Sequence, residues 1–162
     1  MTSRVPSLGP RGEGWVVGQV ILFAVIAGAG LAQLQANGWV TPGGARAVVL
    51  GLAAIGLGGF VAIRALWDLR GGISPFPRPV DGAPLIESGA YRLVRHPIYS
   101  GIVLAALGWG LVTGSLVVLV ATGLLFLLFA GKSLREEAWL SAAHPGYRAY
   151  QQRTKRLIPW VY

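Results

Sequence analysis

The apolar residues of this chain gather into long runs that are separated by short polar segments. Residues 15–35 and 45–66 each match one bilayer crossing, because a spanning helix needs about 20 mostly apolar residues. A third apolar stretch, residues 98–134, is too long for one crossing and is interrupted around Gly114. We therefore predict a helical hairpin with arms over 97–113 and 115–133, in which Ser115 caps the second arm. The pattern predicts an all-α integral membrane protein with about four transmembrane helices.

The polar segments define the remaining parts of the chain. Residues 1–14 are predicted to be a disordered lead-in, and residues 37–44 form a turn. Residues 70–96 hold four prolines, which predicts an extended loop, and the tail is expected to form a short cytosolic helical cap. We treat the two helices of 15–67 and the loop, hairpin and cap of 68–162 as one domain.

Two kinds of spacing predict contacts between helices or within one. Arg64 and Asp68 are four residues apart, which predicts a local ion pair at the end of the second helix. Small residues at a spacing of four would let helix backbones approach closely. The candidate pairs are Gly28 with Ala32, Ala54 with Gly58, and Gly101 with Ala105.

Charge then orients the chain in the membrane. Only 12% of the residues are charged and the net charge is +8. The basic residues lie mainly in the N-terminus, the 68–96 loop and the tail, which an even number of crossings places on one side. Because positive loops stay inside, both termini are predicted to be cytoplasmic in a multi-pass inner or plasma membrane. The same placement favours contact with lipid headgroups and argues against nucleic acid as a partner.

The counts of metal-binding residue types limit the chemistry. The chain has no cysteine, which excludes disulfides, iron–sulfur clusters and thiolate zinc sites. It has two histidines and six acidic residues, so a metal site would have to depend on carboxylates. We therefore expect a mechanism without a metal.

Two polar clusters flank the predicted hairpin, and its tight turn should bring them together. The helix-mouth cluster, residues 91–101, places Pro97 at the first position of a helix with Arg95 and His96 beside its free amide groups, which favour an anion. At the other end of the hairpin, residues 132–137 include the paired glutamates Glu136 and Glu137. Plain alternatives remain open: the helix mouth anchors in headgroups, and Lys132 pairs with Glu136.

The residues of the two polar clusters and of the tail follow one another in an order that resembles a known family. They read Leu85-Ile86-x-x-Gly89-Ala90-Tyr91-Arg92-x-x-Arg95-His96-Pro97-x-Tyr99-x-Gly101, then Glu136-Glu137-x-x-Leu140, His144-Pro145-x-Tyr147-x-x-Tyr150 and Arg156-x-Ile158-Pro159. Over residues 75–159 the chain resembles the isoprenylcysteine carboxyl methyltransferase and phospholipid methyltransferase superfamily of integral membrane enzymes. The resemblance implies S-adenosylmethionine as methyl donor and S-adenosylhomocysteine as product.

The resemblance also implies roles for particular residues. It places the cofactor against Leu85, Ile86, Tyr91, His96, Pro97, Ile98, Tyr99, Glu136 and Glu137. The expected substrate-binding residues are Lys132, Arg95 and Arg135. Lys132 stands where relatives with prenylated substrates have an arginine, so the charge is kept but bidentate recognition of a carboxylate is lost.

The sequence leaves open the acceptor, the need for a base and the placement of two tyrosines. The acceptor is expected to be a lipophilic small molecule or lipid, and the accepting atom is a carboxylate oxygen, an amine nitrogen or a thiol sulfur. An amine or thiol would need a base, for which Glu137 and His96 are the nearest candidates. Tyr147 and Tyr150 share one helical face and either cover a pocket or lie among headgroups. The alternative functions are a non-enzymatic membrane scaffold or transporter subunit, and a sterol-reductase-like oxidoreductase.

Overall fold

The regular structure of the chain is helical throughout the part that the structure describes. The computed structural model describes residues 6, 8–38, 43–69, 76 and 84–162. Predictions for residues 1–5, 7, 39–42, 70–75 and 77–83, which include parts of the lead-in, the first turn and the proline-rich loop, lie outside the described residues. The elements are α1 (Glu13–Asn37), α2 (Gly44–Asp68), the 3-10 helix η1 (Gly89–Arg92), α3 (Pro97–Thr113), α4 (Leu116–Ala143) and α5 (Tyr147–Arg153).

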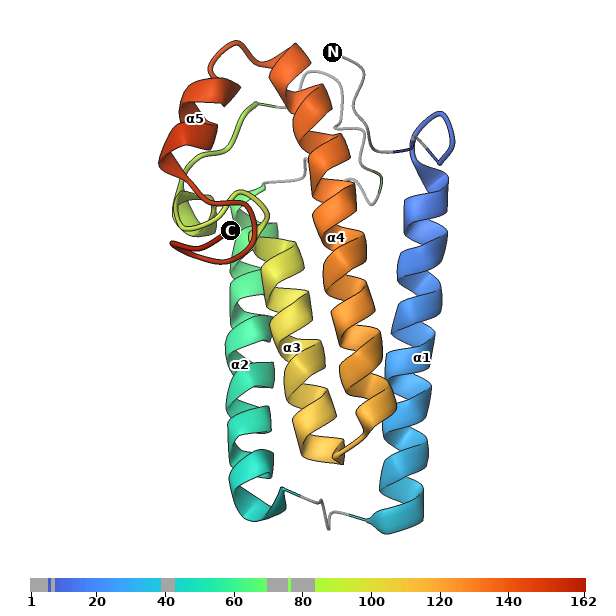
Figure 1. The fold of residues 1–162 in the computed structure, drawn as a ribbon. Helices are drawn as coiled ribbons and strands as arrows, with labels where there is room; N and C mark the ends of the chain where they lie inside the picture. The colour runs from blue at the N-terminus through green and yellow to red at the C-terminus, as the bar shows by residue number, and fades with distance from the viewer. Residues whose placement is uncertain (1–5, 7, 39–42, 70–75, 77–83) are drawn as a thin grey trace.

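Helices α1, α2, α3 and α4 run side by side as a bundle (Figure 1). Helices α1, α2 and α4 are long and apolar enough to cross a bilayer, and α3 is a shorter apolar helix of 17 residues, at the lower end of the usual spanning length. The molecule is an all-α integral membrane protein, which confirms the predicted fold class. The first hairpin arm begins and ends where it was predicted, at Pro97 and Thr113.

The second hairpin arm is longer than predicted. Its expected end was residue 133, whereas α4 continues to Ala143. Charged residues mark the end of an apolar stretch, but they do not end a helix, and no glycine or proline occurs between Gly131 and Pro145. The extra turns carry Glu136 and Glu137.

The polar segments meet at one end of the bundle. Figure 1 shows the start of α1, the end of α2, the start of α3 and the end of α4 at the same end, together with η1 and α5. At the opposite end, Gly114 joins α3 to α4 with φ of 63°, and the Ser115 side chain accepts a hydrogen bond from the Val118 amide at 3.4 Å. This confirms the predicted turn and cap.

Glycines bring α2 and α3 into close contact. A Cβ atom on Gly58 would lie 2.4 Å from the carbonyl oxygen of Gly101, and one on Gly108 would lie 2.4 Å from that of Gly51. The predicted packing roles of Gly58 and Gly101 are thereby confirmed. The prediction for Gly28 is wrong, because a Cβ atom there would meet no described atom within 4 Å. Gly28 is exposed on α1, where a small residue is not required.

The other helices share a buried apolar cluster. It joins one residue of α1, one of α3 and four of α4, namely Ile26, Ala106, Val118, Ala121, Leu125 and Phe129. Helix α1 therefore packs on both α4 and α3, whereas α2 packs mainly on α3. The helix-mouth cluster adjoins this core in α3, where Tyr99 packs against it.

Candidate functional site

Asp68, the last residue of α2, fixes the position of η1. Its Oδ2 accepts a hydrogen bond from the Ala90 amide at 2.8 Å, and its Oδ1 pairs with Arg64 as predicted. Gly89 has φ of 60°, and a Cβ atom there would collide with the Asp68 carboxylate. The local ion pair was predictable from spacing, but the contact of Asp68 with a residue 22 positions later was not.

The chain then enters α3 alongside the C-terminal segment. The Arg95 amide donates to the Lys155 carbonyl at 2.8 Å, and the His96 amide donates to the Arg156 carbonyl at 3.1 Å. Pro97 occupies the first turn of α3 and His96 is its N-cap residue, as predicted. These backbone bonds hold the helix mouth and the C-terminal cap together as one unit.

Glu137 is the centre of a buried ion cluster. Only 4% of its side chain is exposed, and its oxygens lie 2.8 Å from Arg95 Nε, 3.2 Å from His96 Nε2 and 3.1 Å from Arg156 Nη2. Gln151 Nε2 donates to it at 3.0 Å. A buried carboxylate needs such partners to remain charged. Glu137 therefore joins α4, the helix mouth, α5 and the C-terminal segment.

Glu136 has fewer partners and more exposure. Its Oε2 accepts a hydrogen bond from the Tyr99 hydroxyl at 3.0 Å and lies 3.6 Å from His96 Nδ1, while 26% of its side chain is exposed. His96 thus lies between the two carboxylates. The hairpin brings the helix-mouth cluster and the paired glutamates into direct contact, as the sequence predicted.

An aromatic column continues from His96 into the bundle. The ring of Tyr99 stacks on His96 with centroids 5.4 Å apart and on Phe129 with centroids 4.4 Å apart. The buried ammonium of Lys132 lies 5.2 Å from the centroid of the Tyr99 ring, a cation–π arrangement. Its Nζ also donates to Gln19 Oε1 of α1 at 2.8 Å.

Gln19 is a candidate that the sequence reasoning missed. It is a polar residue inside the first span, and its contact with Lys132 joins positions 113 residues apart. Polar side chains within spanning helices are expensive to place and face the bundle interior. A glutamine inside an otherwise apolar run was the available signal, but nothing in the sequence indicated its partner.

The other predicted basic residues occupy different positions. Arg95 is engaged by Glu137 and by the backbone carbonyls of Gln151 and Thr154. The Arg135 guanidinium lies over the Trp139 ring of the same helix, 5.0 Å from its centroid. Of the three expected substrate-binding residues, Lys132 is the one that lies on the aromatic column.

The apolar residues predicted to contact the cofactor lie near a second buried cluster, which is formed by the end of α2 and η1. Ile86 and Ile98 pack against a buried cluster of Ala65, Ala90 and Tyr91, and Leu85 is half-buried beside them. Tyr91 is buried, and burial, followed by the nearby charge of Glu136, raises its pKa above the ordinary value. Its hydroxyl therefore stays protonated at neutral pH.

The tyrosines of α5 are buried rather than placed among headgroups. Tyr147 and Tyr150 are 1% and 3% exposed, and their rings meet edge to face at 5.8 Å. The Tyr150 hydroxyl donates to the Tyr91 carbonyl at 2.6 Å, whereas the buried Tyr147 hydroxyl has no hydrogen-bond partner among the described residues. Burial raises the pKa of both phenols. Of the two open readings, the structure favours a covering role.

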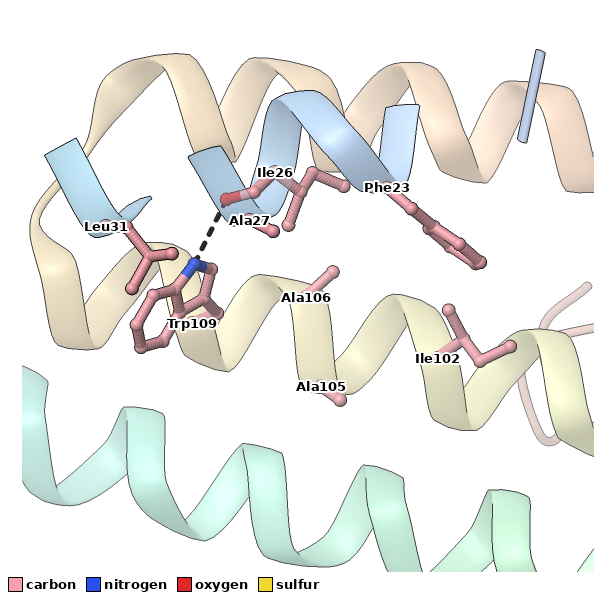
Figure 2. A pocket seen from close by; sticks show the side chains of 8 residues that line it. All are labelled: Phe23, Ile26, Ala27, Leu31, Ile102, Ala105, Ala106 and Trp109. Carbon is pink, nitrogen blue, oxygen red and sulfur yellow. Dashed lines mark hydrogen bonds between the residues drawn. The ribbon is translucent and has the colours of Figure 1, made fainter. Parts of the chain in front are cut away.

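An open apolar pocket of about 400 Å³ lies between α1 and α3, further along the bundle from the helix mouth (Figure 2). Phe23 and Ile26 line it from α1, and Ile102 and Trp109 line it from α3. Trp109 Nε1 donates to the Ile26 carbonyl at 3.1 Å, which ties the two helices together at the end of the pocket far from the helix mouth. Tyr99 precedes Ile102 by one turn on the same helix face, so the pocket and the aromatic column follow one stripe of α3.

The arrangement combines a charged cluster at the membrane boundary with an apolar interior. From Leu116 to Glu136 α4 rises about 30 Å, roughly the thickness of the hydrocarbon core, so the paired glutamates lie near its edge. Such a site can hold a polar, charged molecule from the aqueous side and an apolar one from the bilayer. No group of three or more side chains able to hold a metal ion occurs among the described residues.

Comparison with known families agrees with the resemblance of the motifs. A family model described as phospholipid methyltransferase matches residues 46–145, well over half of the 162-residue chain. The match begins in α2, includes the helix-mouth cluster and the whole of α4, and ends at Pro145. It therefore covers the paired glutamates and their partners on α3.

Two curated relatives match part of the chain. The Cobalt-zinc-cadmium resistance protein CzcN of Cupriavidus metallidurans is 38% identical over 76 residues, which is 46% of this chain and 35% of the relative. Methanethiol S-methyltransferase 1 of Bradyrhizobium diazoefficiens is 34% identical over 70 residues, 43% of this chain and 24% of the relative. The matched segment thus spans about a third or less of these relatives.

Proposed function

The chain belongs to the phospholipid methyltransferase family, and on that basis we propose that it transfers the methyl group of S-adenosylmethionine to a lipophilic or membrane-partitioned acceptor. The family match and the methanethiol S-methyltransferase relative support methyl transfer as the reaction type. The observation that carries the proposal is the contact of His96 and Tyr99 with Glu136 at the membrane boundary. The family match gives no support to the scaffold, transporter and sterol-reductase-like alternatives.

The residues at the helix mouth fit the chemistry of the donor. When bound, S-adenosylmethionine supplies an electrophilic methyl group on a positively charged sulfur. Glu136 offers a partly exposed carboxylate for a cationic or hydroxyl group of the donor. We assign donor binding to Leu85, Ile86, Tyr91, the segment 96–99 and Glu136, which places the cofactor site within residues 68–162.

The paired glutamates have different roles in this proposal. Glu137 is saturated by Arg95, His96, Gln151 and Arg156, so it holds the C-terminal cap in place around the site. Glu136 keeps free surface and contacts the donor. For an amine or thiol acceptor, His96 lies between the two carboxylates and is the group placed to take the proton that leaves.

The acceptor is assigned from Lys132 and the apolar pocket. The buried ammonium of Lys132 attracts an anionic or hydrogen-bond-accepting group, and Gln19 holds this ammonium in place from α1. About one helical turn further along α1 from Gln19 and along α3 from Tyr99, the pocket lined by Phe23 and Ile102 suits a hydrocarbon chain or another small apolar group. In the reaction, a lone pair of the acceptor forms the bond to the methyl carbon while the carbon–sulfur bond breaks and leaves a neutral thioether.

The orientation of the molecule follows from the same proposal. The donor is water-soluble and abundant in the cytoplasm, so the end of the bundle that carries the helix-mouth cluster faces the cytoplasm. This agrees with the gathering of basic residues at that end. Acceptors would enter from the bilayer beside α1 and α3.

A labelled-methyl assay tests the proposal. Protein reconstituted in nanodiscs is incubated with S-adenosylmethionine labelled on its methyl group, together with a membrane lipid extract or a small thiol. We expect label in an organic-soluble product, and a drop of about tenfold or more in kcat/KM for Lys132→Met, because a charge-assisted contact is lost. Arg148→Gln, which removes an exposed charge from α5, is the control and should retain activity.

Two results of this assay would contradict the proposal. One is the absence of labelled product with every acceptor class while the protein remains folded. The other is an equal loss for Lys132→Met and Arg148→Gln, since that would place the acceptor away from the aromatic column.

A further inference from the structure

A basic pocket of about 290 Å³ lies in the C-terminal cap, and the proposed reaction does not use it. Four basic side chains line it: Arg95, Arg153, Lys155 and Arg156. Arg95 and Arg156 share Glu137, and Arg153 pairs with Glu87 at 2.7 Å. Lys155 is exposed, and its side chain has no ion pair with any residue that the structure describes. The four side-chain cations therefore face two side-chain carboxylates, which leaves these side chains with a net positive charge.

An exposed apolar turn borders this pocket. The Val161 amide donates to the Ile158 carbonyl at 3.1 Å and closes a four-residue turn around Pro159 and Trp160. Trp160 has φ of 62°, a conformation that a type II turn normally assigns to glycine. Its side chain is 86% exposed and that of Val161 is 73% exposed. The backbone thus adopts a strained conformation that presents a large apolar side chain to the surroundings.

A contact with α3 fixes the depth of this turn in the membrane. The Ser100 hydroxyl, in the first turn of α3, donates to the Leu157 carbonyl at 2.6 Å. Ser100 lies at the end of α3 that carries the helix-mouth cluster, the same end of the bundle as the paired glutamates. The turn is therefore anchored near the boundary between hydrocarbon and headgroups, where tryptophan side chains are enriched.

We propose that the pocket binds the headgroup of an anionic phospholipid, with the lipid chains lying against Trp160 and Val161. Phosphate oxygens form strong charge-assisted hydrogen bonds with Arg and Lys side chains. Basic pockets beside spanning helices suit anionic headgroups for the same reason. The apolar turn selects a lipid over a soluble phosphate, because only a lipid covers Trp160. The inference rests on the membrane location of the chain and does not depend on methyl transfer.

Native mass spectrometry of the detergent-solubilised, delipidated protein tests this inference. The protein is titrated with dioleoyl phosphatidylglycerol, with dioleoyl phosphatidylcholine, or with glycerol phosphate. We expect preferential binding of phosphatidylglycerol, weakened about fivefold by Lys155→Gln, as expected for one basic residue at a membrane surface. Arg148→Gln removes an exposed charge from the same cap outside the pocket, and its binding should match that of the wild type.

A second variant separates the lipid from its headgroup. Trp160→Ser should weaken phosphatidylglycerol binding while it leaves every positive charge in place. Equal binding of the two lipids, or equal loss in Lys155→Gln and Arg148→Gln, would overturn the proposal. Tight binding of glycerol phosphate that Trp160→Ser does not change would also overturn it, because the site would then bind a soluble anion.

Discussion

Glu136 and Glu137 are neighbours in the chain but have different surroundings. Adjacent positions on a helix point about 100° apart, so only one of them can face the cap. Glu137 turns into the cluster of Arg95, His96 and Arg156, and Glu136 turns toward Tyr99. The sequence predicted that both would lie near the helix mouth, whereas their different partners follow from the position of the C-terminal segment.

The stability of the protein should depend on Glu137 far more than on Glu136. Glu137→Gln leaves Arg95 and Arg156 without their carboxylate, and breaking a buried ion pair from one side typically costs about 3–5 kcal/mol. Glu136→Gln alters a partly exposed group and should cost about 1 kcal/mol or less. Thermal unfolding of both variants in the same detergent checks this. A larger loss of stability in Glu136→Gln would reverse the roles assigned here.

The two tyrosines of α5 provide a second comparison. Tyr150→Phe removes the hydrogen bond to the Tyr91 carbonyl and leaves that buried acceptor unsatisfied, so it should lower the free energy of unfolding by about 1–3 kcal/mol. Tyr147→Phe removes a hydroxyl that has no partner among the described residues and should be neutral or slightly stabilising.

Reversible unfolding in mixed micelles measures both tyrosine variants. Because Tyr147 and Tyr150 are similarly buried, the comparison separates the hydrogen bond from the burial of the ring. Similar destabilisation in the two variants would mean that the Tyr147 hydroxyl has a role that the structure does not account for.

At the scale of helices, α2 and α3 approach each other closely at glycines. The predicted spacing of small residues identified Gly58 and Gly101, but it gave the same weight to Gly28, where an added Cβ atom would lie within 4 Å of no described residue. A small residue on a spanning helix indicates a possible contact. Which face meets a neighbour depends on the arrangement of the whole bundle, and a short motif does not contain that information.

Neighbouring glycines of α2 should therefore respond differently to alanine. In Gly58→Ala the new Cβ atom would lie 2.4 Å from the Gly101 carbonyl oxygen, so the helices must separate, at a cost of about 1–3 kcal/mol. In Gly59→Ala the Cβ atom enters open space, and the higher helix propensity of alanine makes the change neutral or stabilising. Thermal melting of the two variants measures the difference. Equal melting temperatures would contradict the close α2–α3 contact.

Across the whole molecule, hydropathy predicted the long helices, and the predicted hairpin implied that the helix-mouth cluster and the paired glutamates would lie close together. Both predictions depend on information that is local in the chain, namely the lengths of the apolar runs and the presence of a tight turn. The missed contacts join distant positions. Gln19 with Lys132, Asp68 with Ala90, and the helix mouth with residues 155–156 arise only when the bundle closes.

The difference between local and long-range contacts also explains why the C-terminal cap was the least predictable part of the site. Its motif placed Tyr147 and Tyr150 on one helical face, but either burial or headgroup contact was compatible with that spacing. The backbone pairing of residues 94–96 with residues 155–156 decides the question, because it holds α5 over the helix mouth. Such pairing between two short irregular segments has no periodic signal in the sequence.

The central claim is that one donor molecule binds where the helix mouth meets Glu136. Titration calorimetry of the protein in nanodiscs with S-adenosylhomocysteine tests it most directly, with Glu136→Gln as the variant and Glu13→Gln, which removes the same charge from the first turn of α1, as the control. We predict binding by the wild type and by Glu13→Gln, and a loss of about tenfold or more in Glu136→Gln. Wild-type protein that does not bind S-adenosylhomocysteine, or equal affinity in all three proteins, would contradict the claim.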